Sequence, residues 1–189
     1  MRPLVLALLV AAGCHAKSKC TPGTRGSVEL RDGAGGLTLA LKDDAVCDSH
    51  NQQVATLTTK PDGVTLKDLA GNVRLDFTRE TPQVAQVRDR QGPHLRLYRD
   101  ARELRVLRAD GVPLGSVVPE PSGATIFNQA SAPIGRVSLR DRDAVVLDMA
   151  GTALSYIIPG SAGPGPAGVF GVPSLEPVDQ LAIYMYWSR

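Results

Sequence analysis

Arginine is concentrated in one stretch of the chain. Nine arginines fall between positions 74 and 108, against five acidic residues in the same stretch. A planar guanidinium group binds a phosphate or carboxylate through paired hydrogen bonds, so a face built from these side chains would suit anionic lipid headgroups or polysaccharide. The alternative is the outward polar face of several strands, with arginine stems covering apolar surface. The candidate residues are Arg88, Arg90, Arg96, Arg99, Arg105 and Arg108.

Other chemistry-bearing residues form no recognised motif. Asp43, Asp44, Asp48 and His50 lie around Cys47 and could bind a cation, but the spacing and the glycine of a calcium-binding loop are absent. A solvated acidic turn is the alternative. The patterns of zinc proteases, serine hydrolases and dithiol redox proteins are also missing. We therefore expect no catalytic residues, no metal and no cofactor, with a cryptic hydrolase as the remaining enzymatic alternative.

Composition argues against a nucleic-acid partner. The net charge is +2 and aromatic residues make up 4% of the chain. Single-stranded nucleic acid needs a basic surface interleaved with aromatic side chains for base stacking, and both are weak here.

The N-terminus has the features of an export signal. Arg2 precedes an uncharged apolar run, residues 4–12, which is too short to span a bilayer. The following Ala-Ala-Gly-Cys14 resembles the lipobox of bacterial lipoproteins, which implies that residues 1–13 are removed and that Cys14 is acylated. His15, rather than aspartate, resembles lipoproteins sorted to the outer membrane. Two alternatives remain: cleavage after Ala16 to give a soluble periplasmic or secreted protein, or an uncleaved apolar helix.

The other two cysteines then form an even pair. With Cys14 acylated, Cys20 and Cys47 are left in an exported protein, where disulfides persist. We expect them to be bonded to each other, with two free buried thiols as the alternative. Residues 14–25 are then a lipidated N-terminus and short tether, and residues 26–189 a single β-rich domain.

Turn signals recur every 20 residues or so through that domain. Segments rich in Asp, Asn and Gly end at positions 51, 71, 92, 111, 131 and 151. Between them apolar and polar residues alternate; Leu104 and Val106, for example, are separated by Arg105. Two strands per unit predict about twelve antiparallel strands in sequential hairpins.

The end of the chain does not follow this 20-residue spacing. Residues 160–171 are rich in glycine, proline and alanine and are expected to be a flexible loop. Residues 174–188 are expected to form a helix with Ser174 as N-cap. Leu181, Ile183 and Trp187 make that helix apolar on all sides, so it should be buried on all sides.

This order of elements resembles the tubby-like fold of tubby domains, LURP-one-related proteins and phospholipid scramblases. The turns at Asp68, Asp89 and Asp148 and the apolar helix at residues 181–187 carry the resemblance. It implies a β-barrel closed around the C-terminal helix and a scaffold associated with membrane lipids, with no functional residues carried over. A β-sandwich or meander with the helix on one face is the alternative. An outer-membrane barrel is disfavoured because its strands need about 9–11 residues and aromatic girdles.

The expected function follows from location more than from chemistry. We expect a non-catalytic binding or scaffolding domain anchored through Cys14 in the outer membrane and facing the periplasm. The alternative is a tubby-like module that binds lipid or another anionic surface, such as envelope polysaccharide.

Overall fold

The computed structural model describes residues 20–21, 27–159 and 162–188. These residues form fourteen strands and three short helical elements. The strands are β1 (Val28–Asp32), β2 (Leu37–Lys42), β3 (Ala45–Asp48), β4 (Gln53–Lys60), β5 (Gly63–Lys67), β6 (Val73–Arg79), β7 (Val84–Asp89), β8 (Gly92–Arg99), β9 (Leu104–Arg108), β10 (Pro113–Glu120), β11 (Gly123–Asn128), β12 (Pro133–Arg140), β13 (Asp143–Asp148) and β14 (Ala153–Ile158). The helical elements are α1 (Pro164–Ala167), the 3₁₀ turn η1 (Gly168–Gly171) and α2 (Pro177–Trp187).

The strands form one closed antiparallel barrel in which each strand pairs with its neighbours in the chain. The ring closes between β1 and β14, where Glu29 lies opposite Ile158. The expected mainly β, antiparallel barrel is confirmed, and the open sandwich or meander is wrong. The strand number is fourteen rather than about twelve, because a further turn at residues 32–36, between β1 and β2, precedes the six turns that the 20-residue spacing identifies.

Six turns of the barrel repeat one main-chain hydrogen-bonding pattern, whereas the β7–β8 turn is a two-residue loop in which Asp89 pairs with Gly92. In residues 68–72 the Asp68 amide donates to the Asn72 carbonyl, the Gly71 amide donates to the Asp68 carbonyl, and the Asn72 amide donates to Asp68 Oδ1. The fourth residue of these turns has a positive φ, as at Gly71 (81°). The turns at residues 32–36, 48–52, 128–132 and 148–152 share all these bonds, and the turn at residues 108–112 shares the main-chain ones.

These turns all lie at one end of the barrel because the hairpins alternate in direction. We call this end the Asx mouth; it comprises residues 32–36, 48–52, 68–72, 89–92, 108–112, 128–132 and 148–152. The turn amides lower the pKa of Asp148, most strongly through the bond from the Thr152 amide.

A β-bulge follows each turn of the Asx mouth. In the β5–β6 pair, Leu66 lies opposite Leu75 and Lys67 opposite Val73, which leaves Arg74 without a partner. The same register shift occurs in all seven hairpins. The unpaired residues are Thr38, Val54, Arg74, His94, Leu114, Ile134 and Leu154, and from Val54 onward they are spaced by 20 residues.

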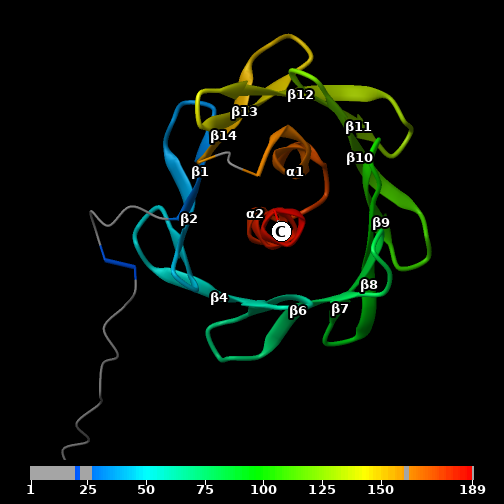
Figure 1. Ribbon diagram of the computed structural model, residues 1–189. Coiled ribbons are helices and arrows are strands. Elements are labelled where there is room, and N and C mark those ends of the chain that lie inside the picture. The colour runs from blue at the N-terminus through cyan, green and yellow to red at the C-terminus, as the bar shows by residue number, and fades with distance from the viewer. Residues whose placement is uncertain (1–19, 22–26, 160–161, 189) are drawn as a thin grey trace, which may run out of the picture.

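The C-terminal helix α2 occupies the centre of the ring (Figure 1). Leu181, Ile183 and Trp187 project in different directions, yet each is at most 2% exposed. Phe77 of β6 stacks on Tyr186 of α2, with ring centroids 5.6 Å apart. A ring of fourteen strands is too wide for strand side chains alone to fill, so the helix supplies the middle of the core.

The helix is shorter than the sequence predicted, and its cap differs. It begins at Pro177, with Glu176 as N-cap and no side-chain capping bond. Ser174 lies outside the helix with a φ of 68°. Proline is favoured in the first helical position because its ring presets φ and its missing N–H group needs no partner there, which fixes the start at residue 177.

The glycine-rich segment is packed inside the barrel, so the expectation of a flexible loop is wrong for its described residues. Residues 165–170 of α1 and η1 are buried. At Gly168, an added Cβ atom would lie 2.4 Å from Val117 Cγ1. Glycine is required there by close approach to the wall, which a sequence pattern does not distinguish from a need for flexibility.

Candidate functional site

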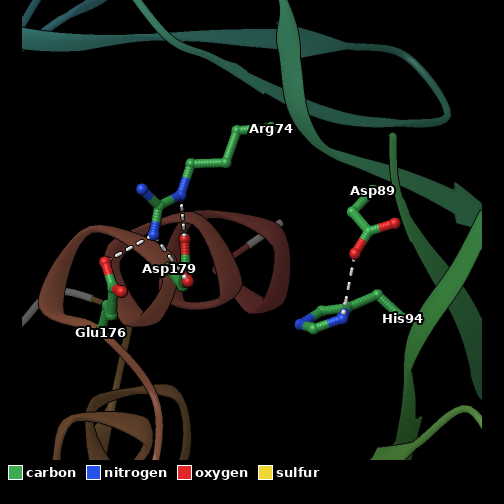
Figure 2. A network of polar contacts seen from close by, with 5 residues as sticks. All are labelled: Arg74, Asp89, His94, Glu176 and Asp179. Atoms are coloured by element: carbon green, nitrogen blue, oxygen red, sulfur yellow. Dashed lines mark hydrogen bonds and ion pairs between the residues drawn. The ribbon is translucent and has the colours of Figure 1, made fainter. Parts of the chain in front are cut away.

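The side chain of Arg74 joins the barrel wall to the start of α2. Its Nε donates to Asp179 Oδ1 at 2.8 Å, and its second guanidinium nitrogen donates to Asp179 Oδ2 at 3.1 Å and to Glu176 Oε2 at 2.6 Å (Figure 2). These bonds raise the pKa of Arg74, Asp179 contributing most. The bulge that leaves Arg74 unpaired in the sheet also determines where its side chain points.

Arg99 holds the other end of the same helix. Its guanidinium donates to the Trp187 carbonyl at 2.7 Å, which is one of the carbonyls that a helix C-terminus leaves without a partner. A cation there also opposes the negative end of the helix dipole. Two arginines, one at each mouth of the barrel, therefore fix α2 along the barrel.

Buried polar groups fix the helix between these two ends. Gln180 Nε2 donates to the Val172 carbonyl at 3.2 Å, and the Tyr184 hydroxyl donates to the Pro159 carbonyl at 3.3 Å. Burial raises the pKa of Tyr184. These bonds connect α2 to the segments that precede it and satisfy the polar ends of the buried Gln180 and Tyr184 side chains.

Two of the hollows at the surface of the Asx mouth are lined by charged residues. One, of about 380 Å³, is lined by Asp68, Arg74, Asp89, Arg90 and Gln91. The other, of about 520 Å³, is lined by Pro93, His94, Leu95, Arg108, Ala109, Asp110, Leu114, Ser174 and Leu175. His94 Nδ1 lies 3.2 Å from Asp89 Oδ2, which connects the two hollows (Figure 2).

The charges that line these hollows are paired with one another. Arg90 donates to Asp68, and Arg108 lies 3.0 Å from Asp110. An anionic ligand would have to displace a carboxylate from each guanidinium group. The arrangement is therefore better suited to holding the mouth together than to binding a phosphate.

The six candidate arginines divide into three groups. Arg88, Arg96 and Arg105 are exposed on the adjacent strands β7, β8 and β9, each next to a buried residue of the inner face. Arg90 and Arg108 belong to the Asx mouth, and Arg99 contacts the helix. The sequence cluster thus contributes three side chains to one outer face, rather than six.

Two of the three outer arginines have acidic partners. Arg96 lies 3.2 Å from Glu80, and Arg105 bonds Glu103 and lies 5.2 Å from the centre of the Tyr98 ring. Arg88 Nε donates to Gln86 Oε1 at 2.7 Å. The outer face of β7–β9 therefore keeps a modest basic character.

The acidic residues near Cys47 are separated by the hairpin geometry. Asp43 and Asp44 form the β2–β3 turn at the far end of the barrel, whereas Asp48 and His50 belong to the Asx mouth. Within the described residues, no group of three or more His, Cys, Asp or Glu side chains is placed to hold a metal ion.

Cys20 and Cys47 form a disulfide on the outside of the barrel. Their Cα atoms are 5.7 Å apart, and both side chains are buried in a small cluster with Ala45, separate from the main core. Cys14 lies outside the described residues. No helix in the described part of the chain is long and apolar enough to cross a bilayer.

No family model, curated protein or solved structure matches this chain. The fold defines it as a closed fourteen-stranded antiparallel barrel that encloses its own C-terminal helix.

The role of Arg74 was not apparent from the sequence, although one signal was available. Arg74 occupies the same place in the 20-residue repeat as the other bulged residues. Aligning the repeats would have separated it from the regular alternation of β6. Its partners lie more than 100 positions away, and no local pattern identifies them.

The bonds between Arg74 and α2 give a testable expectation. We expect Arg74→Met to lower the free energy of unfolding by about 2 kcal/mol, because it leaves Asp179, whose side chain is 15% exposed, without its main partner. Asp179→Asn should be similarly costly. In denaturant titrations the double variant should lose less than the sum of the two, with a coupling of about 1 kcal/mol or more.

The control is Arg105→Met, since Arg105 forms its ion pair on the outer surface. That change should cost under about 0.5 kcal/mol. Strict additivity of Arg74→Met and Asp179→Asn would contradict a direct role of the pair in holding the helix.

Proposed function

We propose that this chain is a lipoprotein of the bacterial cell envelope, anchored through Cys14, whose barrel is a non-catalytic binding or scaffolding domain at the periplasmic face of the outer membrane. The pairing of Cys20 with Cys47 is the observation that carries the proposal. Disulfides persist in oxidising compartments, and this pairing leaves Cys14 as the remaining cysteine of the chain. The pairing therefore supports export of the protein. It also leaves the Cys14 thiol available for acylation.

The filled interior supports a binding or scaffolding role. Lipocalin-like barrels hold a ligand in a central cavity, but here α2, α1 and η1 occupy that space. A partner would therefore be bound on the outer wall or at a mouth. A barrel whose central helix is bonded to the wall at both ends is well suited to presenting such a surface.

A second candidate is binding to an anionic surface, as the tubby-like resemblance implies. The exposed Arg88, Arg96 and Arg105 on adjacent strands favour it. The enclosed C-terminal helix is consistent with the resemblance, whereas the strand number is fourteen rather than about twelve.

Acylation is tested by replacing the acceptor thiol. We expect Cys14→Ser to abolish incorporation of a radiolabelled fatty acid and to leave a larger precursor, because the signal is not removed. Both forms are labelled metabolically and then partitioned between detergent and aqueous phases. The matched control is Cys20→Ala with Cys47→Ala, which removes two cysteines but should retain the lipid label. Unlabelled wild-type protein in the aqueous phase would end the lipoprotein proposal.

A further inference from the structure

Exposed apolar side chains gather at the Asx mouth. The large apolar residues most exposed in the described chain are Leu69 (69%), Met149 (52%), Leu154 (50%), Leu139 (45%), Val54 (38%) and Val73 (37%). All of them except Leu139 lie in the turns of the Asx mouth or in the strand residues and bulges next to them. Scattered exposed apolar residues need no explanation, but a concentration at one end of a barrel does.

These residues also lie on one side of that mouth. They belong to the β3–β4, β5–β6 and β13–β14 hairpins, which with the β1–β2 hairpin are consecutive around the closed ring. We call Val54, Leu69, Val73, Met149 and Leu154 the apolar rim. The β7–β8 and β9–β10 turns across the ring have no large exposed apolar residue among them and carry Asp89, Arg90, Arg108 and Asp110. The rim turns keep one carboxylate each, Asp48, Asp68 and Asp148, and each accepts a hydrogen bond from an amide of its own turn. The mouth is therefore amphipathic.

The N-terminal chain is attached beside the apolar rim. Lys42 Nζ donates both to the Thr21 carbonyl, at 2.9 Å, and to Asn51 Oδ1 in the β3–β4 turn, at 3.2 Å. One ammonium group therefore holds the described start of the chain against the Asx mouth. The disulfide to Cys47 of β3 fixes the neighbouring Cys20.

The covalent distance from this attachment to the lipid acceptor is short. Cys14 is six residues before Cys20 in the sequence, and a fully extended chain of that length spans about 20 Å. The intervening residues include Lys17 and Lys19, which favour an anionic leaflet. An acylated Cys14 would thus keep the β3 wall, and the rim next to it, close to the bilayer.

We propose that the apolar rim inserts into the interfacial layer of the membrane that holds the lipid anchor, with the charged side of the Asx mouth facing water. The proposal rests on the lipid anchor proposed above. A lipid surface is the occupant that the short covalent link and the two lysines favour over a second copy of the chain. The barrel then has one fixed orientation, with the opposite mouth directed away from the bilayer.

The test uses an environment-sensitive fluorophore attached to single introduced cysteines in the full-length lipidated protein. Leu69→Cys and Met149→Cys probe the rim, and Leu139→Cys, at the far end of β12, is the matched control. The native thiols do not interfere because Cys14 is acylated and Cys20 is bonded to Cys47. Vesicles of phosphatidylethanolamine and phosphatidylglycerol with bromine-labelled acyl chains act as quencher, and flotation measures anchoring independently.

In the floated fraction we expect the labels at positions 69 and 149 to lose about half of their fluorescence, and the label at position 139 to remain unquenched. Anchored protein with all three labels equally unquenched would overturn the rim contact while leaving the lipoprotein proposal intact. Protein that does not float would overturn the anchor and the orientation that rests on it. A label at position 69 that reports an apolar environment in the Cys14→Ser protein without vesicles would show that a second copy of the chain covers the rim. That result would overturn the lipid assignment.

Discussion

We expect Leu181→Asp and Ile183→Asp each to lower the free energy of unfolding by about 3–5 kcal/mol. The two residues are 1% and 0% exposed, and they lie about 200° apart around the helix. A helix packed on one face of a sheet would expose one of them. In the closed barrel either carboxylate is buried among apolar side chains without a partner, so each variant should lose most of the domain's stability.

The measurement is the unfolding midpoint in denaturant, with Leu139→Asp as the matched control. Leu139 is 45% exposed, so the same change there should cost under about 0.5 kcal/mol. If an aspartate variant does not fold, Leu181→Ala gives a milder test, with an expected loss of about 2–5 kcal/mol from the cavity it creates. A wild-type-like midpoint for Leu181→Asp or Ile183→Asp would contradict the enclosed helix.

The parts of the fold that follow from alternation were predictable. Leu75 and Phe77 face the helix, whereas Asp76 between them bonds Thr65 on the outside. Leu104 and Val106 are buried, and Arg105 is exposed. A strand between a core and water must alternate with a period of two residues, so these faces can be read from the sequence.

The barrel enclosing α2 was also predictable, because a helix apolar on every side needs a surrounding layer. The helix boundary and residues 162–171 were not. Glycine and proline in that segment indicate flexibility and close packing equally well. Only the approach of Gly168 to Val117 distinguishes them.

The site illustrates a different limit. Alternation correctly places Arg96 and Arg105 on the outer face, but it does not place Arg74 or Arg99, whose partners lie on a helix far along the chain. A bulge and a strand end decide where those two side chains point, and both depend on hairpin register. The clustering of arginines in the sequence is therefore a poor guide to how many of them lie on the outer face.

The disulfide should be the largest single contribution outside the barrel interior. It closes a separation of 27 residues, for which the chain-entropy relation gives about 3–4 kcal/mol. We expect reduction to lower the melting temperature by roughly 10 °C in a domain of this size. Because Cys20 and Cys47 are bonded to each other, neither should react with an alkylating reagent until the protein is reduced.

The same bond fixes the start of the chain to the outer wall. Ala40, Lys42, Ala45 and Cys47 of β2 and β3 are buried, although the other faces of these strands already form the core. In the Cys20→Ala and Cys47→Ala double variant, the midpoint should fall by a similar amount, and reductant should then have no further effect. Two freely alkylated thiols in native, oxidised protein would contradict the bond. Because Cys20 is the fixed point nearest Cys14, this double variant should also show weaker bromine quenching of the label at Leu69→Cys in vesicles, since the rim is released from its position beside the anchor.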